Sequence, residues 1–212
     1  MRIGPARLLN QLTKGRHVRS RKEIREAIGW TYETQLNDPL AWCGEASAFH
    51  DAAVVLHKHE GRFTRVFAFN AGLSLELALK AILVSKGIKI PTMHKLPKLA
   101  DLAKIDVDDD QKYTLESFAT IIEWSGRYPA PTNKLKWDDY HDRILESHTA
   151  REQSGNTHIT IANRKRFPSL ENYMKLWAIF DKEFKEIKSR IPAKRFLYTH
   201  SRDTRFGSKN KY

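Results

Sequence analysis

Residues 62–87 constrain the fold more than any other part of the chain, because they read RFTRVFAFNAGLSLELALKAILVSKG, an almost wholly apolar stretch. The apolar side chains recur at helical spacing, and together they cover most of the helix surface. The positions concerned are Val66, Phe69, Leu73, Leu77, Ala81, Ile82 and Val84. Gly87 then stands where a helix usually ends on glycine. A helix of this kind needs other elements around it, so the sequence predicts the core helix of an all-α bundle.

The other elements also carry mostly helical patterns. Helices are predicted over residues 20–30, 42–59, 96–104, 111–124 and 169–190. Ser169 stands at the N-cap position of the last helix, and the acidic run 106–110 precedes another, where carboxylates complement the helix dipole. Residues 130–168 are the least regular part, with a short helix predicted at 138–149 and an extended piece at 157–162.

The charge is concentrated at the two ends. The 212 residues carry a formal net charge of +12, yet residues 1–22 contain seven basic side chains and no acidic one. Residues 187–212 contain eight basic side chains against Asp203 alone, and the body between is close to neutral. We therefore divide the chain into a basic N-terminal extension (1–36), a helical bundle (37–190, with an insertion at about 130–168) and a basic C-terminal tail (191–212).

Basic ends on a neutral body suit the backbone of a polyanion, which binds by releasing counterions. Aromatic side chains interleaved in the C-terminal tail suit stacking on unpaired bases, which favours RNA over simple solubility. The residues expected to contact nucleic acid are Arg16, Arg19, Arg21, Lys22, Lys194, Arg195, Arg202 and Arg205. Binding of the basic ends to a membrane surface is a third hypothesis, but the N-terminal extension has no Trp/Phe-rich apolar face for it. No apolar run approaches the roughly 20 residues of a spanning helix, so no membrane partner is expected.

The single cysteine, Cys43, excludes an intramolecular disulfide and a multi-cysteine zinc site, and a cytoplasmic location is expected. Cys43 lies among small residues and is expected to be a packed core thiol. His50, His57 and His59 are close enough on one helix to suggest a metal site, but the only carboxylate near them at ligand spacing is Asp51, so they are expected to be ordinary exposed or core histidines. With no Gly-rich phosphate loop, HExxH or CxxC, no metal and no cofactor are expected.

A more specific set of candidate residues consists of polar side chains within and after the apolar helix. Glu76 and Lys80 lie four residues apart in the favourable order, and burial would require them to pair. An ion pair at the bundle surface is the alternative interpretation. Asn70, His94 and Arg127 complete the set.

These residues resemble those of the HEPN domain. Ser74, Glu76 and Leu79-Lys80 match its helix motif, His94-Lys95-Leu96 matches the following loop, and Arg127-Tyr128-Pro129 matches its Arg-Tyr-Pro. Lys95 departs from the commoner acidic or small residue. The resemblance covers about residues 40–130 and the last helix, and excludes the basic ends and residues 130–168.

The resemblance implies an antiparallel four- to five-helix bundle that forms a homodimer. Many members are metal-independent ribonucleases of toxin–antitoxin or phage-defence systems, sometimes with a cognate antitoxin. Their signature is an Arg followed after four to six residues by a His, which serves as acid or base while the Arg stabilises phosphorane charge. Other members bind nucleotide, RNA or a protein partner without cleaving.

Three Arg–His pairs have the required spacing: Arg143 with His148, Arg151 with His158, and Arg195 with His200. Arg143 and His148 are the pair chosen here, since an apolar residue follows Arg143 as the family prefers, and Arg127 is the third candidate catalytic residue. The predicted pocket comprises Asn70, Glu76, Lys80, His94 and Tyr128. The sequence thus leaves two hypotheses, an RNA-directed ribonuclease and a non-catalytic module that binds nucleotide, RNA or a protein.

Overall fold

The structure is a computed structural model that describes residues 20–58 and 64–190. The chain divides into two compact units, residues 1–37 and 38–212, which are described separately. The basic side chains predicted at Arg16, Arg19, Lys194, Arg195, Arg202 and Arg205 lie outside the described residues, as does His59.

The first unit contains two short exposed helices, α2 (Arg21–Ala27) and α3 (Tyr32–Leu36). Helix α2 begins with a capping box, in which Ser20 accepts from the Glu23 backbone and Glu23 accepts from the Ser20 backbone. This reciprocal arrangement satisfies two donors at the helix start. Neither helix buries a residue, so the described part of this unit has no core of its own.

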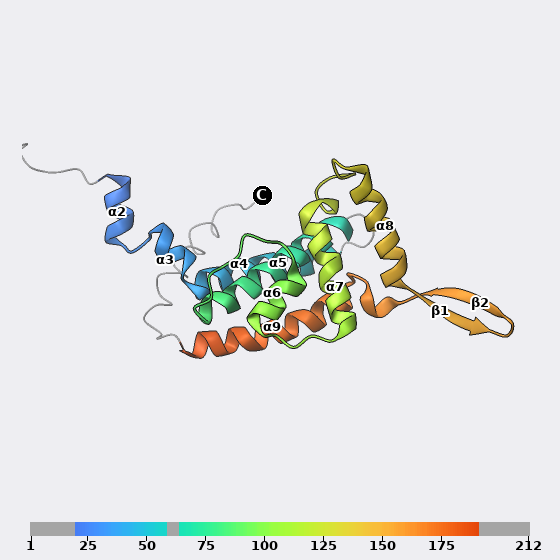
Figure 1. Ribbon diagram of the computed structural model, residues 1–212. Helices are drawn as coiled ribbons and strands as arrows, with labels where there is room; N and C mark the ends of the chain where they lie inside the picture. The colour runs from blue at the N-terminus through green and yellow to red at the C-terminus, as the bar shows by residue number, and fades with distance from the viewer. Residues whose placement is uncertain (1–19, 59–63, 191–212) are drawn as a thin grey trace, which may run out of the picture. The chain divides into compact units, whose positions relative to one another are not determined.

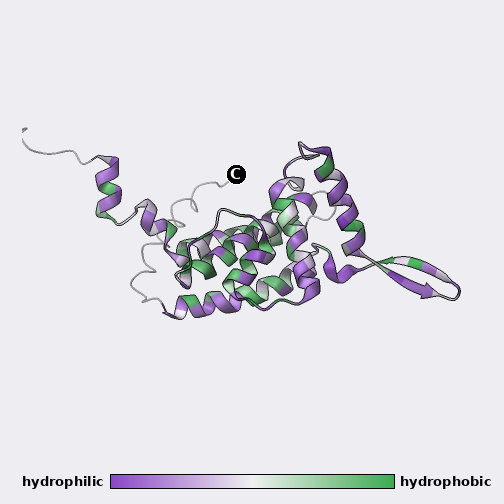
Figure 2. Cartoon of the chain, viewed as in Figure 1, coloured by the Kyte–Doolittle hydropathy of each residue, from purple (hydrophilic) through white to green (hydrophobic). Residues whose placement is uncertain are grey.

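The second unit is a helical bundle, which confirms the all-α prediction (Figure 1). Its main helices are α4 (Pro39–His57), α5 (Thr64–Ser85), α6 (Leu96–Ala103), α7 (Asp109–Thr120) and α9 (Leu170–Arg190). Helix α5 contacts each of the other four and supplies much of the core. Figure 2 shows apolar residues along α5 and the helices packed on it.

Helix α5 is long and apolar enough to cross a membrane by length and composition alone, which the sequence argument above did not allow for. However, 72% of its most apolar window is buried inside the fold. Leu75, Leu79 and Ile82 are completely buried, as the centre of a helical bundle requires.

The predicted helix ends are found where their capping residues stand. Asp108 accepts a hydrogen bond from the Gln111 backbone at the start of α7, and Ser169 accepts one from the Asn172 backbone at the start of α9. Gly87 has φ of 71°, a left-handed conformation that glycine adopts at low cost. It ends α5 as predicted.

Residues 130–168, expected to be the least regular, contain helix α8 (Lys134–His148) and a β-hairpin of β1 (Thr149–Ser154) and β2 (Thr157–Ala162). The helix begins four residues before its predicted start, because the Asn133 side chain caps it. Strand β2 matches the predicted extended piece, whereas β1 was not predicted. The strands pair antiparallel around Gly155, which has φ of 61°, and the 3₁₀-helix η2 (Arg164–Arg166) leads to α9.

Helix α7 does not end regularly but continues as a short π-helix, η1 (Ile121–Ser125), closed by a hydrogen bond from Gly126 N to Ile121 O at 2.8 Å. A Cβ on Gly126 would lie 2.8 Å from that same oxygen and 2.9 Å from the Phe69 ring. Real Cβ atoms do not approach so closely, so this wide turn depends on glycine.

Candidate functional site

Three of the predicted pocket residues meet at the buried carboxylate of Glu76. Its Oε1 accepts a hydrogen bond from Lys80 Nζ at 2.6 Å, and its Oε2 lies 2.9 Å from His94 Nδ1. Glu76 and Lys80 are both buried, whereas 56% of the His94 side chain is exposed. The pairing that burial requires is therefore present, and the surface ion pair considered as an alternative is not.

The local sequence explains this arrangement. Glu76 precedes Lys80 by one helical turn on α5, and the chain after Gly87 returns so that His94 precedes the buried Leu96 at the start of α6. Because a carboxylate only accepts hydrogen bonds, His94 Nδ1 must be the donor. In the neutral ring, Nε2 is then the basic nitrogen, as in histidines that act as acid or base.

The other predicted pocket residues bond within their own segments. Asn70 Nδ2 donates to Val66 O at 2.8 Å, one turn back on α5. Arg127 donates through Nη2 to Glu123 O at 2.6 Å, and its guanidinium lies 5.5 Å from the Tyr128 ring centre. These contacts join Arg127 to Tyr128, but they do not join either residue to Glu76.

The candidate catalytic pair, Arg143 and His148, lies on α8 with the two side chains in different surroundings. Arg143 is exposed and forms an ion pair with Asp139. His148 is buried, with its Nε2 3.1 Å from Ser117 Oγ and its ring centre 4.4 Å from that of Phe167. Burial lowers the pKa of His148, which favours the neutral ring.

Helix geometry explains why Arg143 and His148 diverge. Five residues correspond to roughly 500° of rotation, so the two side chains point about 140° apart. The structure therefore places them on different faces of α8. The other spaced pair in the described residues, Arg151 and His158, lies on the two strands of the hairpin, where His158 pairs with Gln153.

Two of the basic residues expected to contact nucleic acid are described, Arg21 and Lys22 on α2. Both are exposed, and Lys22 lies 3.7 Å from Glu26 in a solvent-accessible ion pair. Exposed pairs of this kind contribute little to stability and leave the cation open to exchange for another anion.

The residues considered for metal binding have other partners. His50 Nδ1 lies 2.7 Å from the Tyr173 hydroxyl, which in turn lies 2.8 Å from Ser74 Oγ, and the His50 ring stacks on Trp177. In the part of the chain described, no three His, Cys, Asp or Glu side chains gather as metal ligands would. Cys43 is a buried core thiol, as predicted, and burial raises its pKa to about 12.

Sequence reasoning missed a cavity of about 480 Å³ near the start of α5, the π-helix η1 and α8. Its lining is rich in aromatic side chains, and Arg65 supplies a cation. The lining residues include Arg65, Trp124, Ser125, Trp137, Tyr140, His141 and Ile144. The spacing of Trp137, Tyr140 and His141 on one helical face was a usable signal, but their distant partners were not visible in the sequence.

Comparison with known protein families matches residues 40–152 to the HEPN domain. That range covers more than half of the chain and extends through α8 into β1. No match was found among curated proteins or among solved structures.

Proposed function

Because this chain belongs to the HEPN domain family, we propose that it is a non-catalytic module that binds RNA or a nucleotide. The observation that carries this choice is the position of His148. An acid or base must reach the proton that it transfers, and His148 is instead buried against Phe167 and Ser117. Arg143 points to another face of the same helix and pairs with Asp139.

The charge of the chain supports RNA as the ligand. Each end carries an excess of seven positive charges, while the body is nearly neutral. Such ends neutralise phosphates without regard to base sequence, so affinity falls as salt rises. We propose further that the protein acts in the cytoplasm as a homodimer, and that a cognate antitoxin or other protein partner binds it, as the family relationship implies.

Fluorescence anisotropy with a labelled tRNA and a labelled single-stranded RNA, in EDTA and over a salt series, tests this proposal. The wild-type protein is expected to bind, and His148→Gln and Arg143→Gln are expected to bind equally well. Absence of binding to either RNA and to mononucleotides would overturn the proposal.

A ribonuclease that uses His94 is the second candidate, and one observation favours it. The His94 ring is oriented by the buried Glu76 carboxylate yet remains largely exposed, which suits an acid or base acting on a ribose hydroxyl. Metal-independent cleavage lost in His94→Gln and retained in His158→Gln would support this candidate. His158 is a matched control because it is also an exposed histidine and lies on strand β2 of the hairpin.

A further inference from the structure

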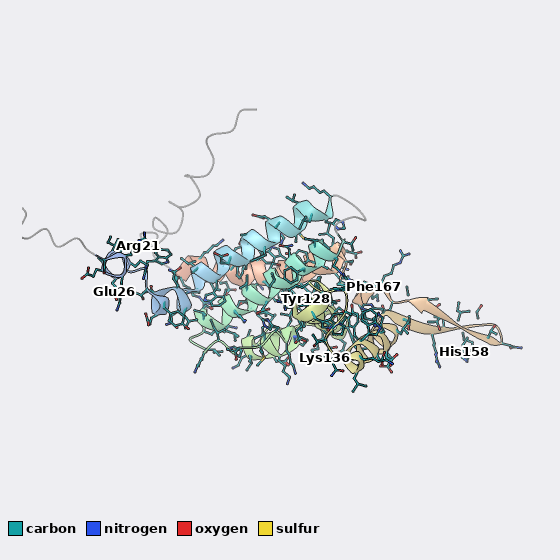
Figure 3. All side chains as sticks on the ribbon, turned by 90° about the horizontal axis from the view of Figure 1, so that it is seen from above. Arg21, Glu26, Tyr128, Lys136, His158 and Phe167 are labelled. Atoms are coloured by element: carbon teal, nitrogen blue, oxygen red, sulfur yellow. The ribbon has the colours of Figure 1, made fainter. Side chains whose placement is uncertain are left out.

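The aromatic side chains that line the cavity come from two separate segments of the chain. Trp124 lies on the π-helix, and Trp137, Tyr140 and His141 lie on one face of α8. Figure 3 shows this end of the bundle, where Tyr128, Lys136 and Phe167 are labelled. With the other lining residues, these rings form an open pocket of about 480 Å³, within the range typical of small-molecule sites.

The rings support one another without filling the space. The Trp124 ring lies edge-on to Tyr140 with ring centres 5.0 Å apart, and the Trp137 ring lies 4.3 Å from His141. Trp137 nevertheless remains 38% exposed. Keeping so much aromatic surface against water is unfavourable, and a ligand that covers it would recover that free energy.

The π-helix gives an independent sign that this wall is specialised. Irregular turns of this type are rare and are frequent at functional sites. Here the irregular turn supplies Ile121, Trp124 and Ser125 to the lining, and its geometry depends on Gly126. Three of the cavity's residues therefore come from the one segment where α7 departs from regular geometry.

The polar groups of the lining indicate what kind of ligand fits. Arg65 is exposed at the start of α5 and carries a permanent positive charge, and Ser125 offers a hydroxyl. A flat aromatic ligand that carries a negative charge matches this combination. An unpaired nucleotide has both parts, since its base stacks on aromatic rings and its phosphate pairs with arginine.

We propose that this cavity binds one unpaired base of an RNA strand, stacked on Trp137, with the adjoining phosphate at Arg65. The proposal rests on the RNA-binding function proposed above and deepens it by naming the subsite. Single-stranded RNA is recognised mainly through splayed bases of this kind. The volume accommodates one nucleotide, so the basic ends would bind the remainder of the strand.

The test is a titration of the full chain with two probes, adenosine 5′-monophosphate and a labelled ten-nucleotide oligouridylate. Trp137→Leu is expected to weaken both by roughly 5- to 150-fold, the range for loss of one stacked base. Tyr113→Leu is its matched control, because Tyr113 is 37% exposed on α7 and stacks with Arg166 instead. The control is expected to bind both probes as the wild type does.

Arg65→Gln keeps every aromatic wall and therefore separates ligand binding from misfolding. It is expected to weaken oligouridylate binding and to reduce the slope of log affinity against log salt by about 0.7, the value for one phosphate of a single strand. Arg151→Gln, an exposed arginine of the hairpin, removes the same charge and is expected to leave the slope unchanged.

The outcomes distinguish the subsite from the function. Wild-type binding to oligouridylate that survives in Trp137→Leu and Arg65→Gln would overturn the subsite and leave RNA binding intact. Failure of the wild type to bind either probe would overturn both. Equal weakening by Trp137→Leu and Tyr113→Leu would show a general loss of structure and would also contradict the assignment.

Discussion

At the scale of single residues, the carboxylate of Glu76 connects the core helix with the loop that precedes α6. It compensates the buried ammonium of Lys80 and orients the ring of His94. The sequence predicted that these residue types must pair, because a buried charge without a partner is costly. It did not predict that Asn70 and Arg127 each donate a hydrogen bond to a backbone carbonyl four residues earlier. Such a local hydrogen bond competes with a long-range contact to the site.

Replacing Glu76 with Gln is expected to destabilise the protein by about 3 kcal/mol, because the buried Lys80 ammonium loses its counter-charge. Urea unfolding measures the change. Glu171→Gln is the matched control, since Glu171 pairs with Lys175 at the same i, i+4 spacing on an exposed surface. Its expected cost is much smaller, because exposed ion pairs contribute little to stability. Equal costs for the two variants would show that Glu76 is not an important electrostatic partner.

Two histidines of the bundle, His50 and His148, predict an acid-sensitive fold. Burial lowers the pKa of both His50 and His148 below the ordinary value near 6.5. As pH falls below that value, the unfolded chain takes up these protons before the native state does, so the free energy of unfolding decreases.

Unfolding curves at pH 7 and at pH 5 check this prediction. The wild type is expected to be less stable at pH 5, and His50→Gln with His148→Gln together is expected to lose less stability over the same interval. A pH dependence identical in the double variant would assign the acid sensitivity to other groups.

At the scale of elements, the hydrophobic periodicity predicted the bundle helices well and predicted the irregular parts poorly. The helices α5 and α9 follow from apolar spacing and from capping residues such as Ser169. Strand β1 (Thr149–Ser154) has no such pattern, because most of its residues are exposed on both faces. The π-helix was not predicted either, because the glycine that its wide turn requires, Gly126, is equally typical of an ordinary helix end.

Two glycine substitutions, one where α5 packs closely on α7 and one on the exposed side of α4, are expected to change stability in opposite directions. Gly72→Ala would place a Cβ 2.8 Å from Ile122 Cγ2 and 3.2 Å from Phe118 O, and is expected to destabilise by about 1–3 kcal/mol. Gly44→Ala on α4 meets no atom within 4 Å and is expected to stabilise by about 0.5–1 kcal/mol through helix propensity. Thermal unfolding distinguishes the two signs, and stabilisation by Gly72→Ala would contradict the packing described.

The candidate site shows the same division between local and long-range information. Glu76 and Lys80 are neighbours on one helix, so their pairing could be predicted. The cavity brings Arg65 and Trp124 together with Trp137, which are far apart in sequence. Only the fold determines that approach, and the sequence alone therefore offered no reason to group them.

At the scale of the whole molecule, the distribution of charge predicts that the basic ends bind the RNA backbone. Neutralising Lys194, Arg195, Arg202 and Arg205 to glutamine is expected to weaken RNA binding at low salt. If all four contact phosphates of a single strand, the slope of log affinity against log salt decreases by about 3. An unchanged slope in a salt titration would show that the C-terminal tail does not contact the RNA backbone.

The function proposed for this HEPN domain protein is to bind RNA without cleaving it. The most direct measurement is the length of a labelled tRNA recovered from its complex with the wild-type protein after prolonged incubation in EDTA. The bound RNA is expected to be recovered intact. Cleavage by the wild type would contradict this function: loss of cleavage in His94→Gln would identify the ribonuclease described as the second candidate, and loss in His148→Gln would make the buried histidine the catalytic residue.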